Sequence, residues 1–64
     1  MIINVKRIET LIAEKGITKK ILAEKSSISA QTLSTILQRG TCEPKTAGKI
    51  AGGLCVSVSE ITAQ

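Results

Sequence analysis

The chain has 64 residues, enough for one small domain that hides only about 60% of the surface its unfolded form exposes. It contains no Phe, Tyr, Trp or His, which removes the commonest general base, the commonest neutral metal ligand and every aromatic platform for stacking on bases. Nine Lys and Arg against five Asp and Glu give a formal net charge of +4. This charge suits a polyanionic partner, although many small domains are mildly basic for solubility alone.

Several classes of protein are disfavoured by what the chain lacks. No apolar run approaches the roughly 20 residues of a membrane span, and the first residues do not resemble a secretory signal, so we expect a soluble cytoplasmic protein with no membrane partner. Cys42 and Cys55 lack a CxxC spacing and are expected to be reduced thiols. No residue pattern predicts a metal, a cofactor or a small-molecule ligand. No activated base accompanies a nucleophile, so we expect no enzymatic activity.

The first predicted helix covers residues 4–15, where apolar residues recur at helical spacing and charged residues fill the other face. Gly16 follows at the position of a left-handed C-terminal stop. A second helix is predicted over residues 19–25, with Thr18 as its cap. Its inner side should carry Ile21, Leu22 and Ala23.

A third helix is predicted over residues 30–39, because Ser29 can cap its start and Gly40 can end it. A connector that contains Pro44 leads to a fourth helix over residues 45–54. Ser57 is the predicted cap of a last, short helix. The chain has no strand signal longer than a few residues and no internal repeat, so the fold class is predicted to be all-α, with five short helices.

The second and third helices have the spacing of a helix-turn-helix, in which the second of the two helices enters the major groove of DNA and the first lies across the backbone. Ala23 is small where the two helices would cross, and Ile28 and Leu33 would fix their angle. We therefore predict a single DNA-binding domain over residues 1–64, with its helix-turn-helix at about residues 18–38.

Two stretches carry a resemblance to a known family. ITKKILAEKSSISAQTLSTIL, at residues 17–37, resembles the helix-turn-helix of the phage repressor and Cro-like (Xre-type) transcriptional regulators, and PKTAGKIAGGLCVSVSEI, at residues 44–61, resembles their fourth and fifth helices. The resemblance implies a compact five-helix lambda-repressor-like domain. It also implies a repressor, of a prophage, a mobile element or the host, that binds a palindromic operator in double-stranded DNA as a homodimer.

The sequence departs from the family pattern at several positions. Ser27 stands where the turn usually has Gly, so a non-Gly residue is expected at positive φ, at a cost on the order of 1 kcal/mol. Cys55 likewise replaces the usual Gly after the fourth helix, and Lys19 replaces a common Gln. The fourth helix contains three poor helix formers, which would either fray it or allow a dimer partner to approach closely. These are Gly48, Gly52 and Gly53.

The exposed face of the third helix should be polar, with no Lys or Arg before Arg39. Gln31 is the strongest candidate to contact a base, because its amide can pair with N6 and N7 of adenine. Ala30 and Thr35 offer methyl groups to thymine, which favours half-sites that contain A·T pairs. Ser34 completes the predicted base-reading set. The alternative is that these are ordinary small surface residues.

A second set of residues around the helix-turn-helix is predicted to contact phosphates, which positions the protein without reading sequence. This set consists of Thr18, Lys19, Thr32, Gln38, Arg39, Lys45 and Thr46. Backbone amides at the capped helix starts near Thr18 and Thr46 can add anion contacts. For Lys20, Lys25 and Lys49, a solvated surface charge is an equally good interpretation.

The last helix is too short to bury both of its sides within one monomer, which makes Val58 and Ile61 candidates for a dimer interface. Equally, these two residues can simply close the monomer core. The leading hypothesis is a sequence-specific DNA-binding transcriptional regulator. The alternative is an antitoxin-like or scaffold module that binds another protein and contacts DNA only weakly.

Overall fold

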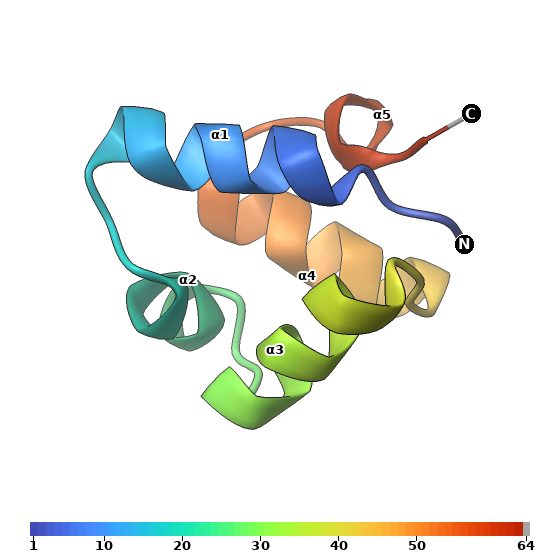
Figure 1. Ribbon diagram of the computed structural model, residues 1–64, viewed down its shortest axis with the longest axis horizontal. Coiled ribbons are helices and arrows are strands. Elements are labelled where there is room, and N and C mark those ends of the chain that lie inside the picture. The colour runs from blue at the N-terminus through green and yellow to red at the C-terminus, as the bar shows by residue number, and fades with distance from the viewer. Residues whose placement is uncertain (64) are drawn as a thin grey trace.

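The computed structural model describes residues 1–63, and these contain five helices. They are α1 (Val5–Lys15), α2 (Lys19–Lys25), α3 (Ala30–Arg39), α4 (Pro44–Leu54) and α5 (Val58–Ile61). Helix α4 lies in the middle of the molecule, with α1 and α5 on one side of it and α2 and α3 on the other (Figure 1). The predicted all-α, five-helix architecture is confirmed.

The helices begin and end where local capping signals predict. The side chains of Asn4, Thr18 and Ser29 each accept a hydrogen bond from a backbone N–H in the first turn of α1, α2 and α3, at 3.0, 3.2 and 3.0 Å. Gly16 and Gly40 end α1 and α3 with φ of 67° and 74°. Helix α4 begins one residue earlier than predicted, because a proline suits the first helical position, where its missing N–H would have no partner.

All five helices contribute to one hydrophobic core. Its largest fully buried side chains are Ile8, Leu22, Leu33, Ile50, Leu54 and Ile61. The predicted inner side of α2 is wrong for Ile21, whose exposed fraction is 39%. Leu22, Ala23 and Ser26 share the buried face of α2, and a 3.6-residue period then turns position 21 toward its edge.

The N-terminal segment, residues 1–4, is a structural element that the sequence did not predict. It lies between the turn after α3 and the residues after α5, and forms isolated β-bridges from Ile2 to Thr41 and from Ile3 to Thr62. The Ile3 N–H donates to the Gly40 carbonyl at 2.9 Å, and Ile3 itself is buried. This segment therefore ties the end of α3 to the end of α5.

Helix α4 is continuous from Pro44 to Leu54 despite its glycines. A Cβ on Gly53 would overlap Ser26 Oγ and would come within 3.2 Å of Leu22 Cδ1. Gly53 is thus needed for the close approach of α2 to α4 within one chain. Gly48 and Gly52 are exposed, and a Cβ at either position would meet no atom within 4 Å.

Candidate nucleic-acid interface

The turn between α2 and α3 is held by backbone hydrogen bonds back to α2. The Ser26, Ser27 and Ile28 N–H groups donate to the carbonyls of Leu22, Glu24 and Ala23 at 2.9, 3.2 and 3.0 Å. Ser27 has a φ of 59°, so the predicted positive φ at this position is confirmed. This turn fixes α3 across α2, which is the arrangement of a helix-turn-helix.

Helix α3 is divided cleanly into two faces. Leu33, Ile36 and Leu37 are buried against the core. All of the predicted DNA-facing residues of this helix are exposed, namely Ala30, Gln31, Thr32, Ser34, Thr35, Gln38 and Arg39. The exposed face carries no charge from residue 30 to residue 38 and ends in a guanidinium group, so it can offer hydrogen bonds and methyl groups to base edges along most of its length.

An open hollow with a volume of about 530 Å³ lies between α3 and the start of α4. It brings together four of the predicted DNA-contacting residues, Thr32, Thr35, Arg39 and Thr46. None of its other lining residues was predicted to contact DNA; these are Met1, Ile36, Thr41, Cys42, Glu43 and Pro44. Thr41 and Glu43 lie in the turn that immediately follows the helix-turn-helix. This position next to α3 could have indicated that they border the interface. Glu43 is the one carboxylate in this lining.

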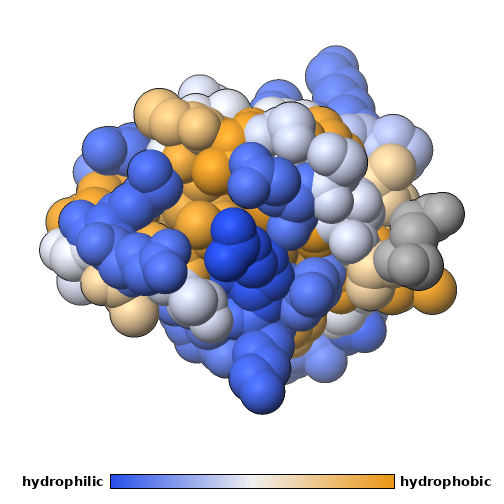
Figure 2. Space-filling model, turned by 90° about the horizontal axis from the view of Figure 1, so that it is seen from above, coloured by the Kyte–Doolittle hydropathy of each residue, from blue (hydrophilic) through white to orange (hydrophobic). Residues whose placement is uncertain are grey.

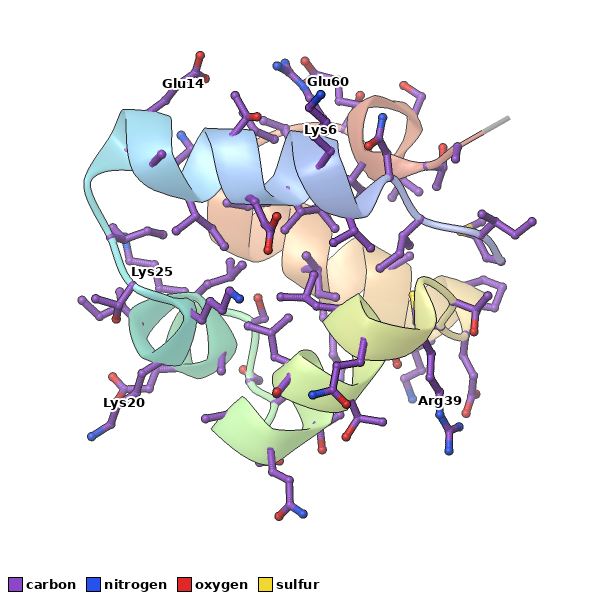
Figure 3. The ribbon with its side chains drawn as sticks, viewed as in Figure 1. Lys6, Glu14, Lys20, Lys25, Arg39 and Glu60 are labelled. Atoms are coloured by element: carbon purple, nitrogen blue, oxygen red, sulfur yellow. The ribbon has the colours of Figure 1, made fainter. Side chains whose placement is uncertain are left out.

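Charged side chains occur on both sides of the molecule. Figure 3 shows Lys20 and Arg39 pointing outward on the side of α2 and α3, whereas Lys6, Glu14 and Glu60 lie on the opposite side, over α1 and α5. Acidic groups also occur on the α2–α3 side, where Glu24 in α2 and Glu43 beside the hollow are exposed. The outer face of α3 itself is uncharged and polar up to Arg39, a combination that suits contacts to a phosphate backbone.

Two ion pairs occur among residues 1–63, and one of them involves a predicted phosphate contact. Lys19 Nζ lies 3.5 Å from Glu9 Oε2, with both side chains about half exposed, at 57% and 52%. An exposed pair of this kind contributes little to stability, so Lys19 can exchange Glu9 for a phosphate. Arg7 and Glu60 form the other pair, also at 3.5 Å. Arg39 and Lys45 take part in neither pair.

Hydroxyl groups at the start and middle of α3 have defined roles. Ser29 Oγ accepts the Thr32 N–H at 3.0 Å and donates to Thr32 Oγ1 at 2.7 Å. The hydrogen of the Thr32 hydroxyl therefore stays available to donate to a phosphate. The Thr35 hydroxyl instead donates to the Gln31 carbonyl at 3.0 Å. Thr18 uses its oxygen to accept the Ile21 N–H and cap α2.

The two predicted dimer-interface residues are placed differently from each other. Ile61 has an exposed fraction of 0% within one chain, so the alternative that it closes the monomer core holds, and the dimer-interface prediction is wrong for Ile61. Val58 is partly buried against the same core. Figure 2 shows the face over α1 and α5, where apolar side chains are exposed beside a band of hydrophilic ones.

Both cysteines are free thiols. Burial raises the pKa of the Cys42 thiol above its ordinary value; the N-terminal ammonium group lowers it and Glu43 raises it further. Little thiolate is therefore present at neutral pH, and Cys42 is a poor nucleophile. Within residues 1–63, no group of three or more His, Cys, Asp or Glu is arranged to hold a metal ion. No helix in this part of the chain is long and apolar enough to cross a membrane.

The turn, the polar outer face of α3 and the supporting helices α1 and α4 together define a helix-turn-helix DNA-binding domain. Comparison with protein-family models agrees: the model of the Cro/C1-type HTH DNA-binding domain matches residues 7–62. The chain belongs to this family, which confirms the resemblance noted in its sequence and the lambda-repressor-like fold. No curated protein and no solved structure matches the chain.

Proposed function

We propose that this protein is a cytoplasmic transcriptional repressor that binds a palindromic operator as a homodimer, with α3 of each copy in the major groove. The observation that carries the proposal is the polar, solvent-exposed outer face of α3 in a Cro/C1-type helix-turn-helix. Repression requires only that the protein occupy a promoter. A single DNA-binding domain can do this if it binds its operator tightly.

Gln31 is the central base-contacting residue of the proposal. It is exposed in the first turn of α3, the part of a recognition helix that reaches base edges. Its amide can donate to N7 and accept from N6 of adenine, a bidentate contact that discriminates against other bases by about 1–3 kcal/mol. Ala30, Ser34 and Thr35 are the other base-contacting residues proposed.

Contacts to phosphates surround this base-contacting set. Arg39, Thr32 and Thr46 line the hollow between α3 and α4, where one strand of the backbone would lie. Thr18 and Lys19 are at the start of α2 and would contact phosphates on the other edge of the groove. Gln38 and Lys45 complete this set. Each lysine or arginine that contacts a phosphate releases counterions, so affinity falls steeply with salt.

The test is selection of duplex DNA from a random pool by the wild type, Gln31→Ala and Gln38→Ala. Wild type should enrich a palindrome whose half-sites are one helical turn apart, about 10 base pairs. Gln31→Ala should lose preference at one position in each half-site, by about 5- to 150-fold. Gln38→Ala is the matched control, because the same side chain is removed from a proposed phosphate contact: binding should weaken equally for all sequences.

Mass measurement by sedimentation, with and without the selected duplex, tests the homodimer, and two chains per palindrome are expected. An enriched site bound by one chain would overturn the dimer. Failure of the wild type to enrich any sequence, together with binding that hardly changes with salt, would overturn the proposal as a whole. It would favour the alternative class, a module that binds another protein.

A further inference from the structure

Met1 and Ile2 together form an exposed apolar patch, the N-terminal patch, with exposed fractions of 49% and 61%. The third exposed large apolar side chain among residues 1–63 is Ile21, which lies in α2. Figure 1 shows the N-terminal segment at one end of the longest axis of the molecule. The bridge from Ile2 to Thr41 places the patch beside the turn that follows α3.

The backbone beneath this patch is held on both sides. The Cys42 N–H donates to the Met1 carbonyl at 3.0 Å, and the Ala63 N–H donates to the Ile2 carbonyl at 3.1 Å. The Met1 ammonium group donates to the Cys42 carbonyl at 3.0 Å, so this charge is bound by its own chain. A contact made by the patch therefore orders little additional backbone, which keeps the entropy cost of that contact low.

The dimensions of the molecule determine which part of its surface two operator-bound copies can share. Half-sites one helical turn apart have centres about 34 Å apart, and the chain measures 26 × 21 × 18 Å along its principal axes. Two copies aligned along their longest axes are then separated by a gap of about 8 Å, close to the roughly 8–10 Å across which packed helices join their side chains. Along the shorter axes the gap is about 13–16 Å, which side chains do not fill. Contact is therefore confined to the ends of the longest axis.

Symmetry distinguishes the two ends of this axis. In a two-fold contact, the same surface of both copies meets, so residues lie near their own counterparts. The end opposite the N-terminal patch carries exposed charged side chains, among them Glu14, Lys15 and Lys25, and Figure 3 shows Glu14 and Lys25 on that side. A two-fold contact there would oppose like charges, which is unfavourable. The side chains of Met1 and Ile2 are uncharged and can face their own copies.

We propose that the N-terminal patch is the contact between two copies of this chain, and that the copies pair on the operator and not in free solution. This inference rests on the proposed function, since it requires two half-sites. A stable interface buries about 800 Å² of each partner, about a fifth of the 3955 Å² that this chain exposes. Two side chains supply only a small part of that area. The contact adds affinity once the DNA holds both copies at a high effective concentration.

The experiment measures the cooperativity between half-sites, defined as the affinity of the second chain for the selected palindrome divided by the affinity for a duplex with one half-site. A third duplex, with roughly five base pairs inserted between the half-sites, turns them to opposite faces of the DNA. Wild type is compared with Ile2→Ser and with Ile21→Ser, the matched control, which removes the same side chain from an exposed position outside the patch. Circular dichroism and thermal unfolding check that both variants keep the fold.

Wild type and Ile21→Ser should bind the second half-site of the palindrome roughly tenfold more tightly, the effect of removing from water the exposed parts of two isoleucine side chains, one from each copy. Ile2→Ser should lose this cooperativity and keep its affinity for a single half-site. On the duplex with the insertion, all three proteins should bind without cooperativity. Retained cooperativity in Ile2→Ser, or an equal loss in Ile21→Ser, would overturn the assignment of the patch and leave the repressor proposal standing.

A charge-swap experiment gives a gain that damage to the fold does not produce. Ile2→Lys and Ile2→Glu should each lose cooperativity, because like charges then meet across the two-fold axis. An equimolar mixture should regain part of it, because the lysine of one copy faces the glutamate of the other. A mixture no more cooperative than either variant alone would overturn a two-fold contact at this position.

Sedimentation of the wild type without DNA tests the second half of the inference, and a single chain is expected at micromolar concentration. A stable dimer without DNA would overturn pairing on the operator and leave the homodimer of the proposed function standing. Absence of any enriched sequence in the selection would overturn both the inference and the proposed function.

Discussion

At the scale of single residues, Ser26 and Gly53 make a close contact between the helix-turn-helix and α4. Ser26 ends α2 with an exposed fraction of 2%, and its hydroxyl oxygen has no hydrogen-bond partner among residues 1–63. The missing Cβ of Gly53 leaves the space that this hydroxyl occupies. Burying this hydroxyl without a hydrogen-bond partner lowers the free energy of unfolding by about 1–3 kcal/mol.

Gly53→Ala should therefore destabilise the protein, although alanine favours helix over glycine by about 1 kcal/mol. The added methyl would lie 3.2 Å from Leu22 Cδ1 and 3.3 Å from the Ser26 backbone nitrogen as well as overlapping the hydroxyl. Overpacking of this kind costs about 1–3 kcal/mol and occasionally more. Urea unfolding monitored by circular dichroism measures the change in the free energy of unfolding.

Gly52→Ala is the matched control, because it makes the same change one residue earlier in α4, where a Cβ meets nothing within 4 Å. It should stabilise the protein by about 0.5–1 kcal/mol. In the Ser26→Ala background, Gly53→Ala should cost less, since the hydroxyl that it overlaps is gone. Equal stabilisation by Gly52→Ala and Gly53→Ala would show that α2 and α4 are not in close contact at this point.

At the scale of elements, the features that were predicted correctly are those whose cause is local in sequence. Thr18 and Ser29 each cap a helix through a side chain only three residues from the N–H that it accepts. Gly16 and Gly40 end helices because glycine tolerates left-handed backbone. The resemblance to the Cro-like family likewise placed Ser27 at positive φ, since the turn geometry demands it whatever residue is present.

The features that were not predicted depend on residues far apart in the chain. Nothing near Gly53 in the sequence indicates that Ser26 lies against it. The sequence therefore predicted only that Gly53 would fray the helix or allow a dimer partner to approach closely. The hollow between α3 and α4 likewise includes Met1, which lies beside the turn after α3 through a hydrogen bond from the Cys42 N–H to its carbonyl. At the candidate interface, periodicity identified the exposed face of α3, but not which of its hydroxyl groups are already engaged.

Ser27→Gly should stabilise the turn of the helix-turn-helix. A non-glycine residue in the left-handed region costs about 1–2 kcal/mol, and glycine loses about 0.5–1 kcal/mol of this gain through the entropy of the unfolded chain. A net gain of roughly 0.5–1 kcal/mol in the free energy of unfolding is expected from these two terms. Ser27→Ala keeps the Cβ and should give no gain. A loss of stability in Ser27→Gly would mean that the exposed Ser27 side chain itself stabilises the turn.

At the scale of the whole molecule, the N-terminal segment joins the two sides of the fold. The Ile3 N–H bonds to Gly40 at the end of α3, and the Asn4 N–H bonds to Ile61 at the end of α5, at 2.9 and 2.7 Å. These partners are far apart in the sequence, and the Ala63 N–H likewise bonds to the Ile2 carbonyl at 3.1 Å. Ile3 is buried in the shared core, so its side chain helps to hold the end of α3 near the end of α5.

Ile3→Ala should destabilise the protein strongly, and Ile2→Ala should not. Ile3 is 4% exposed and Ile2 is 61% exposed, in the same backbone arrangement. Truncating a buried isoleucine costs about 2–5 kcal/mol, a large part of the roughly 3–10 kcal/mol available to a domain of this size. Urea unfolding of both variants measures the difference. DNA binding by Ile3→Ala should weaken in proportion to its unfolded fraction, because the end of α3 and the hollow beside it depend on this segment. Equal stability of the two variants would show that the segment only covers a fold that the five helices complete by themselves.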